Sequence, residues 1–416
     1  MTLSEELQWR GFVQDSTYSD LSQLDNQTVT FYHGFDASAP SQTIGNLAAM
    51  MLDRAMIRHG HKAIILAGGA TSLIGDPGGK DKERPMQTVE TITANVEAAK
   101  VQLGKIFSGL DYTLVNNLDW TKDMTVLEFL RDIGKHYSMT PLVQRDYIAK
   151  RMGEGGEGIS YTEFSYTLLQ GMDYLYLFDN YGCTLQLGGS DQWGNCLSGV
   201  DLIRRARGSE VNVITNKLVI NQATGKKFGK SEEGAVWLDP NLTSPYKFYQ
   251  FWLNLDDEGV EYYLKIYTEL DKETIDQLME QHRAEPHLRK AQKRLAEEVT
   301  RLVHGQDNLA TVQAVTGIIF AATETEVNEE IANSLKTELP VILKNRNQLN
   351  DIPGLLTELG LASSKSEART FLDTGAIKAG LRAEKLNLDS DIARFEQYGF
   401  ILLRRGRNNV AIVELT

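Results

Sequence analysis

The chain has 416 residues, of which 42% are hydrophobic and 24% are charged, as in an ordinary folded globular protein. Its net charge of −13 argues against a protein that coats nucleic acid through bulk electrostatic attraction, although a local basic surface remains compatible with it. Two cysteines exclude a disulfide framework and favour a reducing, cytoplasmic location, and neither a signal peptide nor a membrane helix is expected.

Short strand-like runs alternate with longer helical patterns over the first two thirds of the chain. Strands are expected at 28–34, 62–67, 112–116 and 183–187, and a helix is expected at 42–59. Glycine-rich turns follow several of these strands. The alternation predicts a Rossmann-like α/β domain with a parallel sheet, in which ligands bind at the carboxyl ends of the strands.

The last third of the chain follows a different pattern. Residues 244–320 show helical periodicity without strand signals, and residues 321–350 are mixed and polar, as in a connector. From Asp351 onward, two helices and several short strands predict a small α+β module whose charge is balanced. The predicted boundaries are 1–222 for the Rossmann-like domain with an insertion, 223–325 for a helical domain, 326–350 for a linker and 351–416 for the last module.

The segment 32–46 places a strand, a small-residue turn and the start of a helix in succession. Because unpaired N–H groups and the helix dipole meet at a helix amino terminus, such a start suits a phosphate group. Gly45 would let a flat base approach the backbone closely. Strand, turn and glycine are also common in proteins that bind no nucleotide, so a purely structural role stays open.

The segment 226–231 carries lysines on both sides of Gly229. A loop of this kind can close two ammonium groups over a polyphosphate and stabilise the charge that develops on a leaving pyrophosphate. The alternative is an ordinary solvated basic turn.

Tyr166, Gln170 and Asp173 stand at positions i, i+4 and i+7, so they share one face of a predicted helix. A tyrosine, an amide and a carboxylate are too polar for an ordinary core stripe unless they have partners. This face is therefore a candidate for the wall of a polar pocket.

These segments together resemble the class I aminoacyl-tRNA synthetases. Residues 43–46 stand where that family has H-I-G-H, and residues 227–231 stand where it has K-M-S-K-S. The runs 159–173 and 187–195 resemble the bacterial tyrosyl members. Their Y-x-G-F-D, I-G-D-P and S-P-Y-K-F-Y-Q-F-W motifs also occur, in the family's order, at 32–36, 74–77 and 244–252.

The resemblance implies ATP-dependent ligation of tyrosine to its tRNA through a tyrosyl-adenylate, with release of pyrophosphate and with Mg²⁺ carried by ATP. It assigns tyrosine to Tyr32, Asp76, Tyr166, Gln170, Asp173 and Gln192. It assigns ATP to Gly34, Asp36, Gly45, Gly189, Asp191 and Lys230. It assigns catalysis to Thr43, Asn46, Lys80, Arg84, Lys227, Lys230 and Ser231. None of these is needed as a covalent nucleophile, since the tyrosine carboxylate attacks the α-phosphate in line.

The helical domain corresponds to the family's anticodon-recognition domain, and residues 351–416 resemble an S-four-type RNA-binding domain. The resemblance implies a homodimer and assigns tRNA phosphates to Lys365, Arg369, Arg404 and Arg405.

Thr43 and Asn46 depart from the two histidines of the signature. A threonine hydroxyl can donate one hydrogen bond but carries no charge. A catalytically silent RNA-binding relative therefore stays open as an alternative. The tryptophanyl sister enzyme is a second, separate alternative. The pair Tyr32 and Asp173 suits a phenol better than an indole N–H, and intact Lys227 and Lys230 favour an active enzyme.

Overall fold

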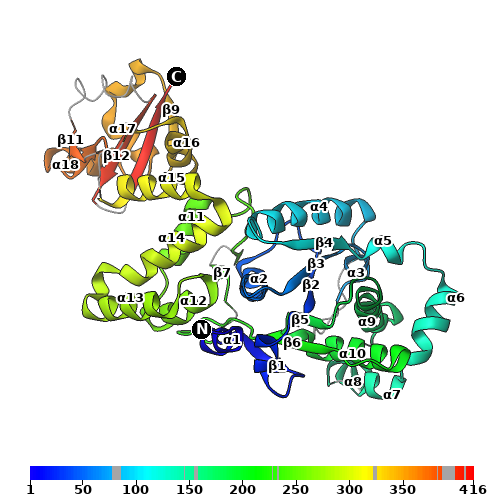
Figure 1. Cartoon of the computed structure of the whole chain (residues 1–416). Helices are drawn as coiled ribbons and strands as arrows, with labels where there is room; N and C mark the ends of the chain where they lie inside the picture. The colour runs from blue at the N-terminus through cyan, green and yellow to red at the C-terminus, as the bar shows by residue number, and fades with distance from the viewer. Residues whose placement is uncertain are drawn as a thin grey trace. The chain divides into compact units, whose positions relative to one another are not determined.

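The computed structural model describes residues 1–76, 86–144, 146–153, 158–226, 228–231, 234–321, 326–381, 383–386, 399–406 and 409–416. These residues form two compact units (Figure 1). The first comprises Met1–Thr243 and Phe251–Val303, and the second comprises Ser244–Gln250 and His304–Thr416.

The first unit is built on a six-stranded sheet in the order β1-β6-β5-β2-β3-β4. Its strands are β1 (Val13–Ser16), β2 (Thr30–Asp36), β3 (Lys62–Gly68), β4 (Tyr112–Asn116), β5 (Leu185–Gly189) and β6 (Asn212–Asn216). All neighbours pair in parallel except β1, which pairs antiparallel with β6. The strand order reverses between β2 and β5, which is where a sheet of this type opens a crevice for a ligand. The predicted parallel α/β fold is confirmed.

Two layers of helices cover the sheet (Figure 1). On one face, α9 (Tyr161–Tyr181) and α10 (Trp193–Arg207) pack against Tyr32, Ile64 and Leu66. On the other, α2 (Ile44–Arg58) hydrogen-bonds to His33, and α4 (Val89–Ile106) packs on Ala67. Side chains alternate between the faces along each strand, so adjacent residues of β2 contact different helices.

The following shorter strands and helices complete the first unit. They are α1 (Leu3–Arg10), α3 (Gly69–Ile74), α5 (Leu118–Thr121), α6 (Val126–Glu128), α7 (Met139–Val143), α8 (Asp146–Met152), β7 (Lys230–Ser231), β8 (Gly234–Ala235), α11 (Pro245–Leu253), α12 (Val260–Tyr267), α13 (Lys272–Ala284) and α14 (Lys290–His304). Of these, α11 begins in the second unit and α14 ends in it. The helical character predicted for 244–320 is thus present.

The second unit has a five-stranded sheet in the order β11-β10-β12-β13-β9. Its elements are α15 (Gln306–Thr316), α16 (Glu329–Glu338), β9 (Val341–Lys344), α17 (Ile352–Glu358), α18 (Lys365–Asp373), β10 (Ile377–Ala379), β11 (Glu384–Lys385), β12 (Phe400–Arg405) and β13 (Asn409–Leu415). The predicted linker at 326–350 is wrong, because it contains α16 and β9. β9 pairs in parallel with β13, and Ile331 and Leu335 of α16 are buried in the core beneath the sheet.

Candidate functional site

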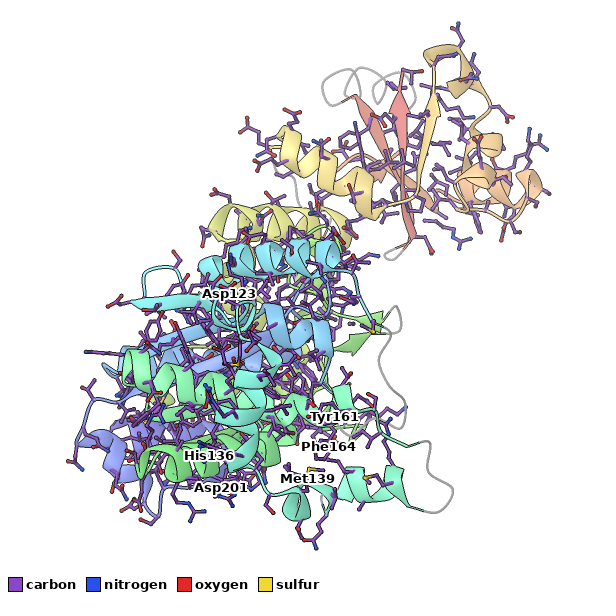
Figure 2. The ribbon with its side chains drawn as sticks, turned by 90° about the vertical axis from the view of Figure 1, so that its right-hand side faces the viewer. Asp123, His136, Met139, Tyr161, Phe164 and Asp201 are labelled. Atoms are coloured by element: carbon purple, nitrogen blue, oxygen red, sulfur yellow. The ribbon has the colours of Figure 1, made fainter. Side chains whose placement is uncertain are left out.

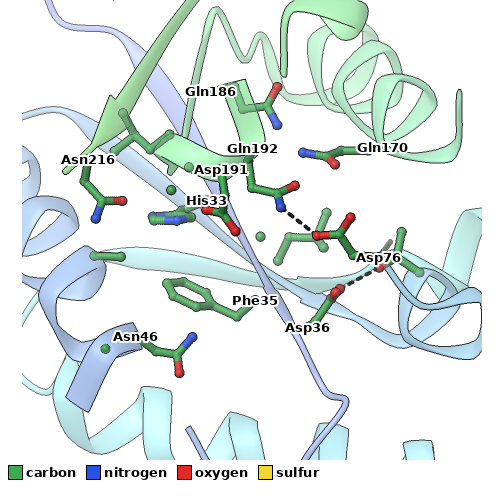
Figure 3. A pocket seen from close by; sticks show the side chains of 18 of the residues that line it. His33, Phe35, Asp36, Asn46, Asp76, Gln170, Gln186, Asp191, Gln192 and Asn216 are labelled. Carbon is green, nitrogen blue, oxygen red and sulfur yellow. Dashed lines mark hydrogen bonds between the residues drawn. The ribbon is translucent and has the colours of Figure 1, made fainter. Parts of the chain in front are cut away.

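A cavity of about 270 Å³ lies in the first unit at the carboxyl ends of β2 and β5 (Figure 3). Its wall is made by β2, the start of α2, the middle of α9 and the segment that follows β5. Every described residue that the sequence assigned to tyrosine lines it, namely Tyr32, Asp76, Tyr166, Gln170, Asp173 and Gln192. Thr43 and Asn46 also line it, as do Gly34, Asp36, Gly45, Gly189 and Asp191.

The deep end of the cavity contains polar atoms without partners. Tyr32 is only 2% exposed, and its hydroxyl has no hydrogen-bond partner among the residues that the structure describes. The same holds for Gln170 Oε1 and Gln186 Oε1. Buried polar groups are nearly always hydrogen-bonded in folded proteins, so these atoms indicate a polar ligand.

Asp173 lies beside them and is held by two donors. Asn117 Nδ2 and Trp120 Nε1 each donate to one of its carboxylate oxygens at 2.9 Å. Burial raises the pKa of Asp173 to about 7, although these two hydrogen bonds lower it in part. Asn117 and Trp120 follow the carboxyl end of β4, a position that could have suggested their role.

A second set of polar side chains lies in the cavity next to this deep end. Tyr166 Oη donates to Asp36 at 3.1 Å, and Gln192 Nε2 donates to Asp76 at 2.6 Å (Figure 3). Thr71 Oγ1 also donates to Asp36 at 3.2 Å. Burial and the Asp36 carboxylate raise the pKa of the Tyr166 hydroxyl well above its usual value, so it stays a donor. The carboxylates of Asp36 and Asp76 make this wall of the cavity suited to a cation.

The amino terminus of α2 forms the opposite wall. Thr43 donates to Asn46 Oδ1 from its hydroxyl at 2.8 Å and from its backbone N–H at 3.0 Å. The two residues that depart from the signature therefore bind each other. Asn46 turns toward the cavity (Figure 3), and its amide nitrogen makes no hydrogen bond to a described residue.

The lysine loop is anchored by its phenylalanine. Phe228 is buried and contacts Tyr263, Phe251, Trp252 and Tyr267, with ring centroids 4.3, 5.4, 5.7 and 5.8 Å away. Gly229 has φ = +90°, and a Cβ there would lie 2.9 Å from Ile44 Cγ1 of α2. Only glycine therefore fits where the loop approaches the amino terminus of α2.

The backbone of Lys230 and Ser231 forms β7, which pairs antiparallel with β8. Lys227, Lys80 and Arg84 lie outside the described residues, and the structure likewise does not describe the side chains of Lys230 and Ser231.

The residues of the cavity wall that were not predicted include His33, Gln186 and Asn216. Asn216 Oδ1 is buried without a partner within the described chain. Gln186 is a polar residue inside an otherwise apolar strand, which is a signal that sequence reasoning could have used. Asn216 ends β6, a strand that the sequence analysis did not identify.

In the second unit, the predicted basic residues separate into two groups. Lys365 and Arg369 are exposed on α18, and the Arg405 guanidinium lies 5.1 Å from the ring centre of Phe371. Arg404 is only 3% exposed and donates to the carbonyl oxygens of Ile318 and Ile319. Alternation along β12 places Arg404 on the face that carries Phe400 and Leu402, which other elements cover. The prediction that Arg404 contacts tRNA is therefore wrong.

Neither a metal-binding group nor a membrane helix is found in the part of the chain that the structure describes. No cluster of three or more histidine, cysteine, aspartate or glutamate side chains there could hold a metal ion. No helix there is long and apolar enough to cross a bilayer.

The chain is similar to known proteins over nearly its whole length. A family model described as tRNA synthetases class I (W and Y) matches residues 24–321. The tyrosine–tRNA ligase of Listeria monocytogenes serotype 4a (strain HCC23) is 40% identical over 421 residues, covering 99% of each chain. That of Bacteroides thetaiotaomicron is 40% identical over 429 residues, covering 98% of each. A C-terminally truncated mitochondrial tyrosyl-tRNA synthetase of Aspergillus nidulans has a similar crystal structure. Its TM-score is 0.68 at 32% identity, over 75% of this chain and 92% of that one.

Proposed function

The chain belongs to the class I tRNA synthetases for tryptophan and tyrosine and ligates tyrosine to tRNA with ATP, and we propose that the cavity between β2 and β5 activates the tyrosine. The observation that carries this proposal is the unpartnered Tyr32 hydroxyl in the cavity that also contains Asp173. A phenol hydroxyl between them would donate to the carboxylate and accept from Tyr32. An indole N–H can only donate, so it would leave the Tyr32 donor unpaired.

The ammonium group of tyrosine lies near Tyr166, Gln170 and Asp76 in this proposal. Gln170 Oε1 has no partner within the described chain, and the Asp76 carboxylate accepts from Gln192. An ammonium group has three donors and no acceptor, which matches a wall of carboxylate, amide and phenol oxygens. Gln192 then orients Asp76 and borders the aminoacyl-adenylate.

ATP extends from the tyrosine toward the amino terminus of α2 in this proposal. Gly34, Asp36, Gly189 and Asp191 border the sugar, and Gly45 with Asn46 border the base and phosphates. Mg²⁺ enters with ATP, held mainly by its phosphates. The tyrosine carboxylate displaces pyrophosphate by in-line attack, so the protein supplies position and charge. We assign that charge to the side chains of Lys80, Arg84, Lys227 and Lys230. Ser231 follows Lys230 in the lysine loop and is assigned to the same step.

The reaction should depend on pH through Asp173, whose pKa burial raises to about 7. The ionised carboxylate accepts a stronger, charge-assisted hydrogen bond from the phenol than the protonated acid can. We therefore expect kcat/KM for tyrosine to rise with pH through about 7 and then level off. As a control, kcat/KM for ATP at saturating tyrosine should lack this step, because the bound phenol keeps Asp173 ionised. A flat profile for tyrosine between pH 6 and 8 would contradict the assignment.

The second unit binds tRNA phosphates through Lys365, Arg369 and Arg405 in this proposal. We expect Arg405→Ala to weaken tRNA binding a few-fold and to lower the slope of log affinity against log salt concentration by about one. Tyrosine-dependent pyrophosphate exchange should stay unchanged. Arg404→Met is the matched control: it should lower the melting temperature, because it leaves the carbonyl groups of Ile318 and Ile319 without their donor, while keeping the salt slope. A lower salt slope in Arg404→Met and a lower melting temperature in Arg405→Ala would instead assign tRNA binding to Arg404 and the structural role to Arg405.

The enzyme acts as a homodimer in the cytoplasm in this proposal. The segment from α6 to the start of α9 exposes large apolar side chains. They are Val126, Leu127, Leu130, Met139, Met152 and Tyr161. Two of them, Met139 and Tyr161, are labelled in Figure 2. An apolar surface of this kind fits a second copy of the chain. Light scattering should give twice the mass of one chain, and Leu127→Glu should reduce it; a monomeric parent refutes the dimer.

Charging of a tyrosine tRNA transcript with labelled tyrosine tests the complete reaction. We expect charging that requires ATP. If the protein binds this tRNA but does not charge it, the result would favour the alternative of a catalytically silent RNA-binding relative.

A further inference from the structure

Four side chains form a hydrogen-bonded network that runs from α9 through the start of α10 to the cavity. Thr167 Oγ1 donates to Asn195 Oδ1 at 2.8 Å, and Asn195 Nδ2 donates to Gln192 Oε1 at 3.1 Å. Gln192 Nε2 in turn donates to Asp76 Oδ2 at 2.6 Å, the bond drawn in Figure 3. Gln192 and Asp76 line the cavity, whereas Thr167 and Asn195 are buried outside its wall. We call these four residues the amide network.

The direction of every bond in the amide network follows from Asp76. A carboxylate can only accept, so the Gln192 amide turns Nε2 toward it and Oε1 away from it. Oε1 then needs a donor, which is Nδ2 of Asn195, and this turns Oδ1 of Asn195 toward Thr167. The Thr167 hydroxyl completes the network because it can donate. Reversal of either amide would place two acceptors face to face.

A close crossing of α9 and α10 brings Thr167 to Asn195. A Cβ on Gly171 would lie 3.5 Å from the Cα of Gly199, and these glycines follow Thr167 and Asn195 by four residues each. The two hydrogen-bonded side chains therefore lie about one helical turn from this contact. Ser198 joins the same turns through the backbone: its hydroxyl donates to the carbonyl oxygen of Asn195 at 2.6 Å and lies 3.3 Å from that of Thr167. The helix contact and the amide network thus use different side chains.

We propose that Asn195 and Thr167 are positioning residues that fix the Gln192 amide, and through it the Asp76 carboxylate, for the ammonium group of tyrosine. This inference rests on the proposed function of the cavity. Neither residue lines the cavity, so each acts on the ligand only through Gln192. Because the network fixes the direction of Gln192 Nε2, the Asp76 carboxylate is already oriented when tyrosine arrives. Such preorganisation removes part of the entropic cost of ordering the site on binding.

Two tyrosine analogues separate the ammonium group from the rest of the ligand. Tyrosinol retains this group, and desaminotyrosine lacks it. Both are measured as inhibitors of tyrosine-dependent pyrophosphate exchange with the full-length protein. We expect Asn195→Ala to raise KM for tyrosine and the inhibition constant of tyrosinol about tenfold, because the Gln192 amide is no longer held. The inhibition constant of desaminotyrosine should change by less than about twofold.

Thr167→Val makes the same test in a variant that keeps the side-chain volume. It should raise KM for tyrosine and the inhibition constant of tyrosinol about threefold, because Asn195 still reaches Gln192 but loses the donor that orients its own amide. Thr167→Ser keeps the hydroxyl and should stay within about twofold of the parent.

A double-mutant cycle tests whether Asn195 acts through Gln192. In a Gln192→Ala background, Asn195→Ala should cause no further rise in KM for tyrosine, because the amide that it holds is already absent. Residues that act independently would instead give additive losses.

Ser198→Ala is the matched control for a purely structural role. It removes a buried hydroxyl that joins the same turns of α9 and α10 but lies outside the amide network. It should lower the melting temperature and leave the ratio of the two inhibition constants unchanged.

The possible failures give different results. An active Asn195→Ala variant with unchanged KM for tyrosine, or with equal rises in both inhibition constants, would overturn the positioning role. Additive losses in the double-mutant cycle would overturn the route through Gln192. A parent without any tyrosine-dependent exchange would contradict the proposed function itself.

Discussion

Asp173→Asn is expected to lower kcat/KM for tyrosine by about a thousandfold in pyrophosphate exchange. The substitution removes the charge that would accept the phenol hydroxyl. It also turns an amide N–H toward Asn117 or Trp120, both of which already donate to this side chain. One buried donor is then left unpaired in addition to the lost charge-assisted bond. The loss should be smaller for phenylalanine, so the preference for tyrosine over phenylalanine should narrow.

Trp120→Phe is the matched control for this prediction. It removes one donor to Asp173 and keeps an aromatic ring on Tyr176, which Trp120 stacks on with centroids 4.4 Å apart. The expected loss is about tenfold, because the Asn117 donor remains. An Asp173→Asn variant that keeps kcat/KM for tyrosine within tenfold of the parent would rule out Asp173 as the phenol partner.

Phe228→Ala is expected to lower the free energy of unfolding of the first unit by about 3–5 kcal/mol. The ring fills a site between Tyr263, Phe251, Trp252 and Tyr267, and its removal leaves a cavity that these large rings cannot close. The lysine loop also loses its anchor beside α2, so kcat should fall together with stability. Urea denaturation and pyrophosphate exchange measure the two effects.

Phe228→Met separates volume from aromaticity. The family signature K-M-S-K-S has methionine in this place, and a swap that nearly conserves volume should cost less than about 1.5 kcal/mol. Equal stability losses in the Ala and Met variants would show that ring stacking, not filled volume, anchors the loop. Unchanged stability in Phe228→Ala would contradict the packing argument.

The parts of the site that sequence could predict are those with a local pattern. Tyr166, Gln170 and Asp173 reach the same cavity because helical spacing alone places them on one face of α9. Thr43 and Gly45 do so because a strand, a turn and a helix start adjoin in sequence. The parallel sheet followed from the alternation of short and long apolar patterns.

Residues that depend on long-range packing were missed. Asn117 and Trp120 reach Asp173 only because β4 ends beside α9, across more than fifty residues of sequence. The pairing of His33 with Asp53 depends on which face of β2 the helix α2 covers. No spacing rule in a single sequence contains that information.

Two errors have the same origin. Arg404 and Arg405 are neighbours in a basic run, but strand alternation places Arg404 on the face of β12 that carries Phe400 and Leu402, where other elements cover it. The segment 326–350 is polar because α16 buries only Ile331 and Leu335 and β9 is an edge strand. Composition alone therefore predicted a linker where the structure has two packed elements.

Tyrosine-dependent exchange of labelled pyrophosphate into ATP, with phenylalanine and tryptophan as controls, tests the central claim most directly. Exchange with tyrosine alone is predicted, because only a phenol satisfies both the Tyr32 hydroxyl and the Asp173 carboxylate. Equal exchange with phenylalanine or tryptophan, or none with any amino acid, would contradict the assignment of this cavity to tyrosine activation.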